Sequence, residues 1–210
     1  LPLKRLDTLR IAAVSIGEVG SSFQDMLSNY APITYFSIND KTTVAEQAVL
    51  LNKLSKFNLV IASVHKSNAN AWKSYKIDKN VDIFLQSIAL QSKVVLSVFA
   101  NPYSINSFLF TNNFDAFLLG YQNSKVAQQE VAQAIFGGIS LSGKIPVTTK
   151  HFDMNSGINT KAIRMCYVTP EEIGFNNEWL YKIDSIAQHA ITEKATPGCQ
   201  VLIAKEGKVF

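Results

Sequence analysis

Three loops of this chain carry residues that could do chemistry. Glu18 lies in the Gly-Glu-Val-Gly run 17–20, His65 begins a His-Lys-Ser run, and Asn101 begins an Asn-Pro-Tyr run. A carboxyl or an imidazole group can give or take a proton, and the glycine amides of residues 17–20 could bind an anion. Each loop also has a structural interpretation, as a tight turn, a surface histidine or a proline that begins a helix. The residues alone leave both interpretations open.

Each of these loops follows an apolar run of strand length. The runs are continuously apolar for the most part, which is typical of strands buried on both faces, and lie at 10–16, 33–38, 58–64, 93–99 and 115–120. Segments with apolar residues at helical spacing alternate with them, at 21–30, 42–55, 80–91, 103–110 and 124–136. The alternation predicts an α/β domain with a doubly wound, mostly parallel, flavodoxin-like sheet over residues 1–150. Ligands of such sheets bind beyond the carboxyl ends of the strands, so Glu18, His65 and Asn101 are the candidate cleft residues.

The ends of the expected elements carry local signals as well. Thr42 or Thr43 with Glu46 is a capping box at the start of the second helix, and Gly137-Gly138 ends the last helix. Residues 143–148 then predict a final extended segment.

Two short motifs imitate known catalytic patterns. Residues 138–144 approach a phosphate-binding loop, but Ile145 stands where a magnesium-binding hydroxyl is required, and the run follows a helix rather than a strand. Ser63 and Lys66 have the spacing of serine hydrolase motifs, with Tyr121-Gln122-Asn123 as a further match. In those enzymes the serine opens a helix, whereas Ser63 ends an expected buried strand. We interpret both matches as coincidence.

The last part of the chain predicts a second, incomplete unit. Residues 151–168 are polar and aperiodic and are expected to be a linker. An amphipathic helix is expected at 176–194, followed by an apolar strand at 199–205 and a turn at 206–208. This makes a short α+β tail of a helix, a strand and half a hairpin with no partner strands, which is marginal in water. We therefore expect the chain to be a fragment of a longer protein.

Composition excludes several classes of function. An apolar fraction of 47% with 17% charged residues allows a sizeable core in a chain of 210 residues. The net charge of +4 is spread over scattered lysines, which argues against nucleic acid as a partner. Cys166 and Cys199 have no metal-ligand or redox spacing, so neither a metal nor a cofactor is expected. No apolar run has the length of a membrane span, and the compartment stays open.

Four runs together resemble the C-terminal α/β domain of glycoside hydrolase family 3. They are SVFANPY at 97–103, LGYQNS at 119–124, AQAIFGG at 132–138 and SGKIPVT at 142–148. The last two are the specific part, and the resemblance covers residues 1–150. Residues 167–191 and 196–210 resemble the first helix and strand of the β-lactamase-like serine hydrolases, which are met as fusion partners of certain family 3 enzymes in bacteria. Residues 169–210 are then expected to be the truncated start of that domain.

The resemblance implies an accessory role for this chain. In the family the aspartate nucleophile lies on a TIM barrel, which would precede Leu1, and the serine and lysine of the second module would follow Phe210. The proton donor is a barrel histidine in the N-acetylglucosaminidase branch, whereas a glutamate of the C-terminal domain can serve in the β-glucosidase branch. No catalytic residue is therefore assigned to this chain, which is expected to be inert by itself.

The expected partners are the barrel and the serine hydrolase domain of the same protein and a carbohydrate substrate. The resemblance is compatible with a parent protein of the bacterial periplasm. Two alternatives stay open, namely a free-standing flavodoxin-like binding module and a non-catalytic partner of a serine hydrolase.

Overall fold

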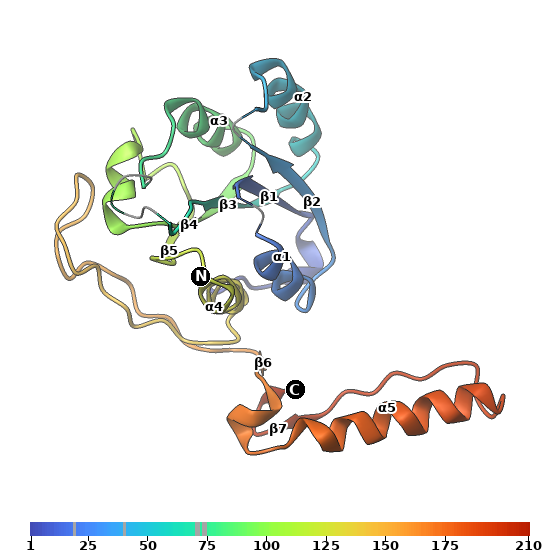
Figure 1. The fold of residues 1–210 in the computed structure, drawn as a ribbon. Coiled ribbons are helices and arrows are strands. Elements are labelled where there is room, and N and C mark those ends of the chain that lie inside the picture. Colours follow the sequence, from blue (N-terminus) through green and yellow to red (C-terminus); the bar gives the residue numbers. More distant parts are fainter. Residues whose placement is uncertain (19, 40, 70–71, 73–74) are drawn as a thin grey trace.

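Figure 1 shows a computed structural model of the chain, which describes residues 1–18, 20–39, 41–69, 72 and 75–210. Its main body contains a five-stranded sheet in the order β2-β1-β3-β4-β5, and all pairs are parallel. The strands are β1 (Ile11–Gly17), β2 (Ile33–Ile38), β3 (Leu59–His65), β4 (Lys93–Phe99) and β5 (Ala116–Leu119). Parallel neighbours require a crossover between strands, which the helices supply. The predicted doubly wound α/β fold is confirmed.

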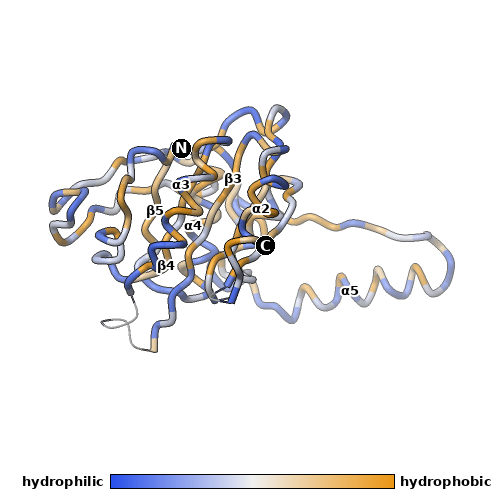
Figure 2. The backbone as a smooth tube through the Cα atoms, turned by 90° about the horizontal axis from the view of Figure 1, so that it is seen from above, coloured by the Kyte–Doolittle hydropathy of each residue, from blue (hydrophilic) through white to orange (hydrophobic). Residues whose placement is uncertain are grey.

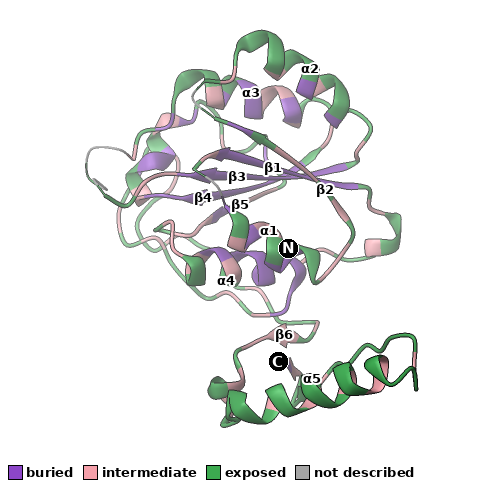
Figure 3. Cartoon of the chain, turned by 45° about the vertical axis from the view of Figure 1, so that its right-hand side comes forward, coloured by how far each residue is buried: buried purple, intermediate pink, exposed green. Residues whose placement is uncertain are grey.

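Helices cover both faces of this sheet (Figure 3). One face packs against α2 (Val44–Leu54) and α3 (Lys79–Ala89), and the other against α1 (Ser21–Ser28) and α4 (Lys125–Phe136). Because successive strand residues point to opposite faces, each continuously apolar strand contributes to two separate cores. This explains why the central strands β1 and β3 are buried at nearly every position.

The predicted helix ends are found with one difference in helix type. Thr43 and Glu46 form the capping box of α2, and Gly137 ends α4 with a left-handed φ of 80°. A Cβ atom at Gly137 would also lie 2.7 Å from Pro2, so both the positive φ and the close contact favour glycine at this position. The helix predicted at 103–110 is instead the 3-10 helix η2 (Pro102–Ser107), which Asn101 caps.

Residues 137–165 run without helix or strand, but they are tied to the main body. Thr160 donates its amide to Leu141 O at 2.8 Å, and Ile163 donates to Gly137 O at 2.8 Å. The guanidinium of Arg164 donates to Leu3 O at 2.8 Å and to Phe136 O. The second half of the expected linker 151–168 therefore lies against the N-terminal arm and the end of α4.

The tail holds a small second sheet and a projecting helix. The sheet has the order β6-β8-β7, with β6 (Cys166–Tyr167), β7 (Ala204–Lys205) and β8 (Lys208–Val209). The expectation of a hairpin without a partner strand is wrong, because β6 pairs with β8 in parallel. The strand predicted at 199–205 is reduced to its last two residues, since 199–203 finds no neighbouring strand in the described chain.

After the 3-10 helix η3 (Pro170–Ile173), the helix α5 (Asn177–Thr192) points away from the main body (Figures 1 and 2). None of its residues is buried, and Trp179 is 65% exposed. Its apolar stripe therefore has no cover among the described residues. The short 3-10 helix η1 (Leu6–Thr8) lies in the N-terminal arm.

Candidate functional site

The three candidate residues lie at the carboxyl-terminal edge of the main sheet. Glu18 follows β1, His65 is the last residue of β3, and Asn101 follows β4. The chain changes direction across the sheet between β1 and β3, since β2 lies on one side of this pair and β4 on the other. This is the switch point at which open α/β sheets bind their ligands. The amide of Glu18 donates to His65 O at 3.2 Å, which joins the first two loops.

His65 is buried, so the interpretation as a surface histidine is wrong. Its ring is stacked on Phe99 with centroids 4.7 Å apart, and the residue is 1% exposed. On another side lies Gly20, where an added Cβ would come within 2.3 Å of the ring. Burial lowers the pKa of His65, while the hydrogen bond to Asn123 and the charge of Glu18 act in the opposite direction. The imidazole is therefore neutral at neutral pH.

A chain of hydrogen bonds defines which nitrogen of His65 carries the proton. The amide of Phe23 can only donate, so the oxygen it meets at 3.1 Å is Oε1 of Gln128. Nε2 of Gln128 therefore donates to Oδ1 of Asn123 at 2.7 Å. Nδ1 of His65 lies 2.9 Å from the same oxygen and must donate to it, because that oxygen has no proton to give. Nε2 of the neutral ring is then the acceptor for the Ser63 hydroxyl at 2.9 Å.

These hydrogen bonds join a hydroxyl, an imidazole and an amide in the order in which a catalytic triad joins its nucleophile, its base and its orienting group, namely Ser63, His65 and Asn123. The three residues cannot act as a triad here, because Ser63 is 2% exposed and lies within the central strand of the sheet. A substrate has no path to the hydroxyl without opening the core. They form a structural network, in line with the interpretation of the serine hydrolase motif as coincidence.

The network determines which way the side-chain amide of Asn123 is oriented. With Oδ1 of Asn123 occupied by two donors, its Nδ2 donates to Oε2 of Glu18 at 3.1 Å. The backbone of Asn123 pairs in both directions with the side chain of Asn68, at 3.0 Å each. Glu18 itself is exposed at the rim. Asn123 thus joins the loops after β1, β3 and β5 and holds a solvent-facing carboxylate.

Asn123 was not among the candidates from sequence, although it was noted as part of the Tyr-x-Asn match. The signal that could have found it is its place directly after the last apolar strand run, where the switch-point rule applies as it does to the other loops.

A cleft of about 330 Å³ lies beside this network. It opens at the ends of β3, β4 and β5 and is lined by Lys66, Ser67, Asn68, Tyr75, Ala100, Asn101, Pro102, Tyr121 and Gln122. Asn101 is therefore in the cleft, and its Oδ1 accepts the amide of Tyr103 at 3.0 Å. His65 is not among the described lining residues, but its hydrogen bond to Asn123 connects it to Asn68 in the lining.

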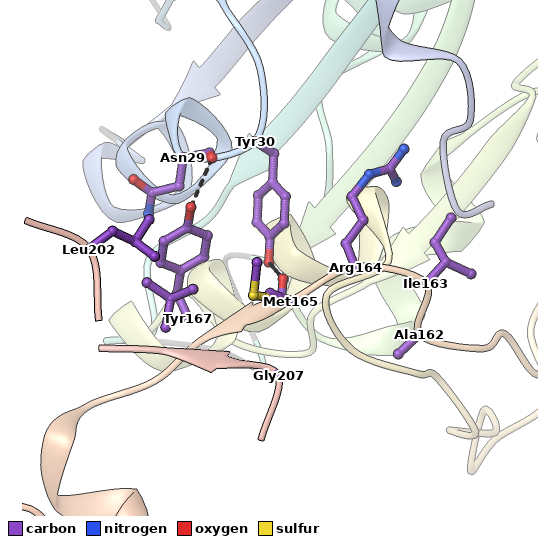
Figure 4. Close-up of a pocket in the computed structure, with 10 residues that line it drawn as sticks. Asn29, Tyr30, Ala162, Ile163, Arg164, Met165, Tyr167, Leu202 and Gly207 are labelled. Carbon is purple, nitrogen blue, oxygen red and sulfur yellow. Dashed lines mark hydrogen bonds between the residues drawn. The ribbon is translucent and has the colours of Figure 1, made fainter. Parts of the chain in front are cut away.

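A second hollow, of about 650 Å³, lies between the main body and the tail (Figure 4). Tyr30 and Tyr167 stand at its wall, with ring centroids 5.4 Å apart. The hydroxyl of Tyr167 donates to Asn29 O at 3.1 Å, and that of Tyr30 contacts Met165 O at 3.1 Å. Burial raises the pKa of Tyr30, so this hydroxyl stays protonated. These polar groups are already hydrogen-bonded to the protein itself. The hollow marks the contact between residues 163–167 and the main body, which we call the seam.

The seam contains a buried glutamine that recognises backbone. Gln133 is 2% exposed and lies on α4. Its Oε1 accepts the amide of Tyr167 at 2.7 Å, and its Nε2 donates to the carbonyl of the same residue at 3.1 Å. One side chain therefore pairs with Tyr167 as a neighbouring strand would, while β8 occupies its other side.

Neither a cluster of metal ligands nor a membrane-spanning helix is found among the described residues. Among residues 1–18, 20–39, 41–69, 72 and 75–210, no three His, Cys, Asp or Glu side chains gather as metal ligands would. No described helix combines the length and the apolar character needed to cross a bilayer.

Comparison with known proteins gives a likeness of shape. No protein-family model matches the sequence, and no curated protein matches it. Among solved structures, the chain is similar to a fungal multi-domain glycoside hydrolase family 3 (GH3) β-N-acetylglucosaminidase with a GCN5-related glucosamine N-acetyltransferase region. The TM-score is 0.57 at 20% identity, over 75% of this chain and 18% of that chain. It is also similar to a GH3 exo-β-xylosidase, with a TM-score of 0.50 at 14% identity, over 69% of this chain and 22% of that chain.

The structural likeness supports the fold, whereas sequence identities this low leave the activity open. The chain spans about a fifth of the length of the solved proteins it matches.

Proposed function

We propose that this chain is the accessory C-terminal α/β domain of a glycoside hydrolase of the β-N-acetylglucosaminidase or β-glucosidase type, which hydrolyses O-glycosidic bonds. In this proposal the domain supports a catalytic barrel and closes one wall of its sugar cleft. The observation that carries the proposal is the carboxyl-terminal edge of the sheet. There an exposed carboxylate, Glu18, is held by the fixed amide of Asn123 beside a cleft with amide and tyrosine side chains.

The comparisons support this proposal at the level of fold. Both solved proteins are described as GH3 enzymes and are several times longer than the part that this chain matches. Of the sequence runs that resemble the family, 97–103 and 119–124 contribute residues to the cleft lining, and 142–148 lies beside it through the hydrogen bond from Tyr121 to Lys144 O. The run 132–138 is buried at the end of α4 and supports the fold instead.

The chemistry of glycoside hydrolysis explains why the chain needs a partner. Retaining and inverting enzymes both place two carboxyl groups on either side of the scissile bond. Glu18 bonds to the amide of Asn123, and the described lining of the cleft beside it contains no acidic residue that could be the second carboxyl group. His65 is neutral and enclosed, so it cannot exchange a proton with a substrate directly. We therefore expect the chain by itself to be inert.

The test is the hydrolysis of aryl glycosides. The purified chain should release no aryl alcohol, whereas the same chain joined to the barrel encoded before it should do so. Turnover by the chain alone that disappears in Glu18→Gln would refute the accessory role. A gene without any barrel before this segment would favour the free-standing binding module instead.

We also propose that residues 169–210 begin a second module of the β-lactamase-like serine hydrolase type. The uncovered apolar stripe of α5 favours this, because a helix without a covered face needs a further layer. A version of the chain extended by the encoded downstream residues should bury Trp179, seen as a blue shift of its fluorescence. An unchanged spectrum would contradict the proposal.

A further inference from the structure

We propose that the cleft at the ends of β3, β4 and β5 binds an anionic saccharide, with Lys66 at the anionic group and Tyr121 at the face of the sugar ring. This deepens the proposed function and rests on it, since it names the class of sugar that the same edge of the domain accepts. The argument comes from the polarity of the hydrogen-bonding groups, the conformation of Tyr121 and the charge of the lining.

Three side-chain oxygens of the cleft lining already accept a hydrogen bond. Oδ1 of Asn101 accepts the amide of Tyr103, Oδ1 of Asn68 accepts the amide of Asn123, and Oγ of Ser67 accepts the amide of Ala69 at 3.3 Å. Three donors of the lining have no hydrogen bond among the described residues, namely Nδ2 of Asn101, the hydroxyl hydrogen of Ser67 and the ammonium of Lys66, while the side-chain amide of Gln122 offers both a donor and an acceptor. These donors favour a ligand rich in acceptors, as a carboxylate or a phosphate is.

Tyr121 is held in a conformation that tyrosine rarely adopts. Its φ of 62° lies in the left-handed region, and its side chain is 42% exposed. On one side of it the amide of Gly120 donates to Val98 O at 2.8 Å, and its own hydroxyl donates to Lys144 O at 3.2 Å. A bulky residue with positive φ is a cost that functional sites often carry. Here the conformation places Tyr121 in the lining of the cleft, where the C–H face of a sugar can pack against its ring.

The charge of the lining fits an anion. Lys66 is the charged residue among the described lining residues, and none of them is acidic. Glu18 is outside the lining and bonds to Asn123 Nδ2. The second tyrosine, Tyr75, adds an aromatic surface rather than a charge. The cleft therefore combines one cation, neutral donors and aromatic rings, which together match a ring with an acidic substituent.

The experiment is a titration of the 210-residue chain, followed by NMR or calorimetry, with glucuronate, methyl glucoside, α-glucosyl phosphate and inorganic phosphate. We expect glucuronate or glucosyl phosphate to bind more tightly than methyl glucoside, and the stronger of the two identifies the anionic group. Lys66→Gln should weaken that binding about tenfold and leave methyl glucoside unaffected. Lys93→Gln, at the opposite edge of the sheet, removes the same charge and should change nothing.

Tyr121→Asn provides a test that separates binding from folding. Asparagine tolerates positive φ, so the melting temperature should stay the same or rise, while the affinity for the anionic sugar falls about fivefold. Loss of stability in this variant would show that the conformation serves packing, and the proposal would be overturned.

Three other results would also overturn the proposal, namely equal binding of methyl glucoside and glucuronate, inorganic phosphate binding as tightly as the best sugar, and no binding of any ligand. The proposed function would survive these results, because its own test is turnover in the presence of the barrel. Conversely, the chain could bind an anionic sugar preferentially and yet show no turnover when joined to the barrel. In that case the proposed function would fail, and the inferred sugar binding would be the function of a binding module.

Discussion

Nδ1 of His65 lies 2.9 Å from Oδ1 of Asn123, 58 residues further along the chain. This contact joins the end of β3 to the loop between β5 and α4, and through Asn123 Nδ2 it reaches Glu18 after β1. The buried face of the network is the ring of His65, and the exposed face is the carboxylate of Glu18. The rim of the candidate site is therefore joined to the core beneath it by hydrogen bonds.

The space around His65 should be intolerant of a single methyl group. A Cβ at Gly20 would lie 2.3 Å from the ring, so Gly20→Ala should lower the free energy of unfolding by about 1 to 3 kcal/mol through overpacking. Gly143→Ala is the matched control, because nothing lies within 4 Å of a Cβ there. Urea denaturation of both variants tests this. Equal stability of the two variants would mean that the ring moves aside freely.

Stability should depend on pH through His65. Its pKa is held below the ordinary value of 6.5, mainly by burial, so the unfolded chain takes up this proton more readily than the folded one. The contribution of the neutral ring is fully present above pH 6.5 and is lost as the pH falls below that value. Urea denaturation in steps from about pH 8 to about pH 5 should show this loss.

His65→Gln is the comparison for the pH series, because its amide can still bond to Asn123 and Ser63 but cannot be protonated. The fall of the free energy of unfolding below pH 6.5 should be smaller in this variant. An unchanged fall would assign the pH dependence to other groups. Burial and the charge of Glu172 raise the pKa of Glu130 above its ordinary 4.5, so this group lowers the free energy of unfolding as the pH rises above 4.5. The effect has the opposite sign to that of His65, and it is present in both the unaltered chain and the His65→Gln variant.

Removing the amide of Asn123 should be costly. Asn123→Leu leaves His65 Nδ1, Gln128 Nε2 and a carboxylate oxygen of Glu18 without their partners. We expect a loss of about 2 to 4 kcal/mol, since buried donors lose hydrogen bonds that water cannot replace. Asn113→Leu removes an exposed amide that bonds to Gln86 and serves as the control. Thermal denaturation that finds the two substitutions equally mild would contradict the role of the network.

The docking of residues 163–167 should depend on Gln133. Gln133→Leu leaves both backbone groups of Tyr167 unpaired on that side, so the amide of Tyr167 should exchange its hydrogen much faster than in the unaltered chain. The same change at Gln129, on the same helix but without a described hydrogen bond, should have no such effect. Cleavage by a protease between 150 and 168 should rise in the Gln133 variant alone. Equal cleavage in all three proteins would mean that this segment is a free linker.

The helix α5 should be the least stable element of the chain. None of its 16 residues is buried, and an isolated helix of that length is marginal in water. Hydrogen exchange should therefore be fast throughout α5 and slow in α4, whose apolar residues lie in the core. Protection of α5 that grows with protein concentration would instead indicate pairing with a second copy of the chain.

Sequence alone determined the layers of the main body, because the signals involved act over short distances. The continuously apolar runs predicted the strands, of which the central β1 and β3 are buried on both faces and the edge strand β2 is not. The capping box of Thr43 and the left-handed Gly137 depend on residues within one turn. The order of α and β elements and the candidate loops at Glu18 and Asn101 followed from these signals.

Only the tertiary structure decided which side chains meet. The burial of His65 depends on Phe99 at the end of β4 and on Gly20 before α1. The position of its proton follows from a chain of hydrogen bonds that starts at the amide of Phe23. The pairing of Gln133 with Tyr167 and of β6 with β8 joins segments that have no local reason to pair. Such contacts depend on the order of strands in the sheet and on the path of the chain around it, because their energy comes from partners distant in sequence and not from local propensity.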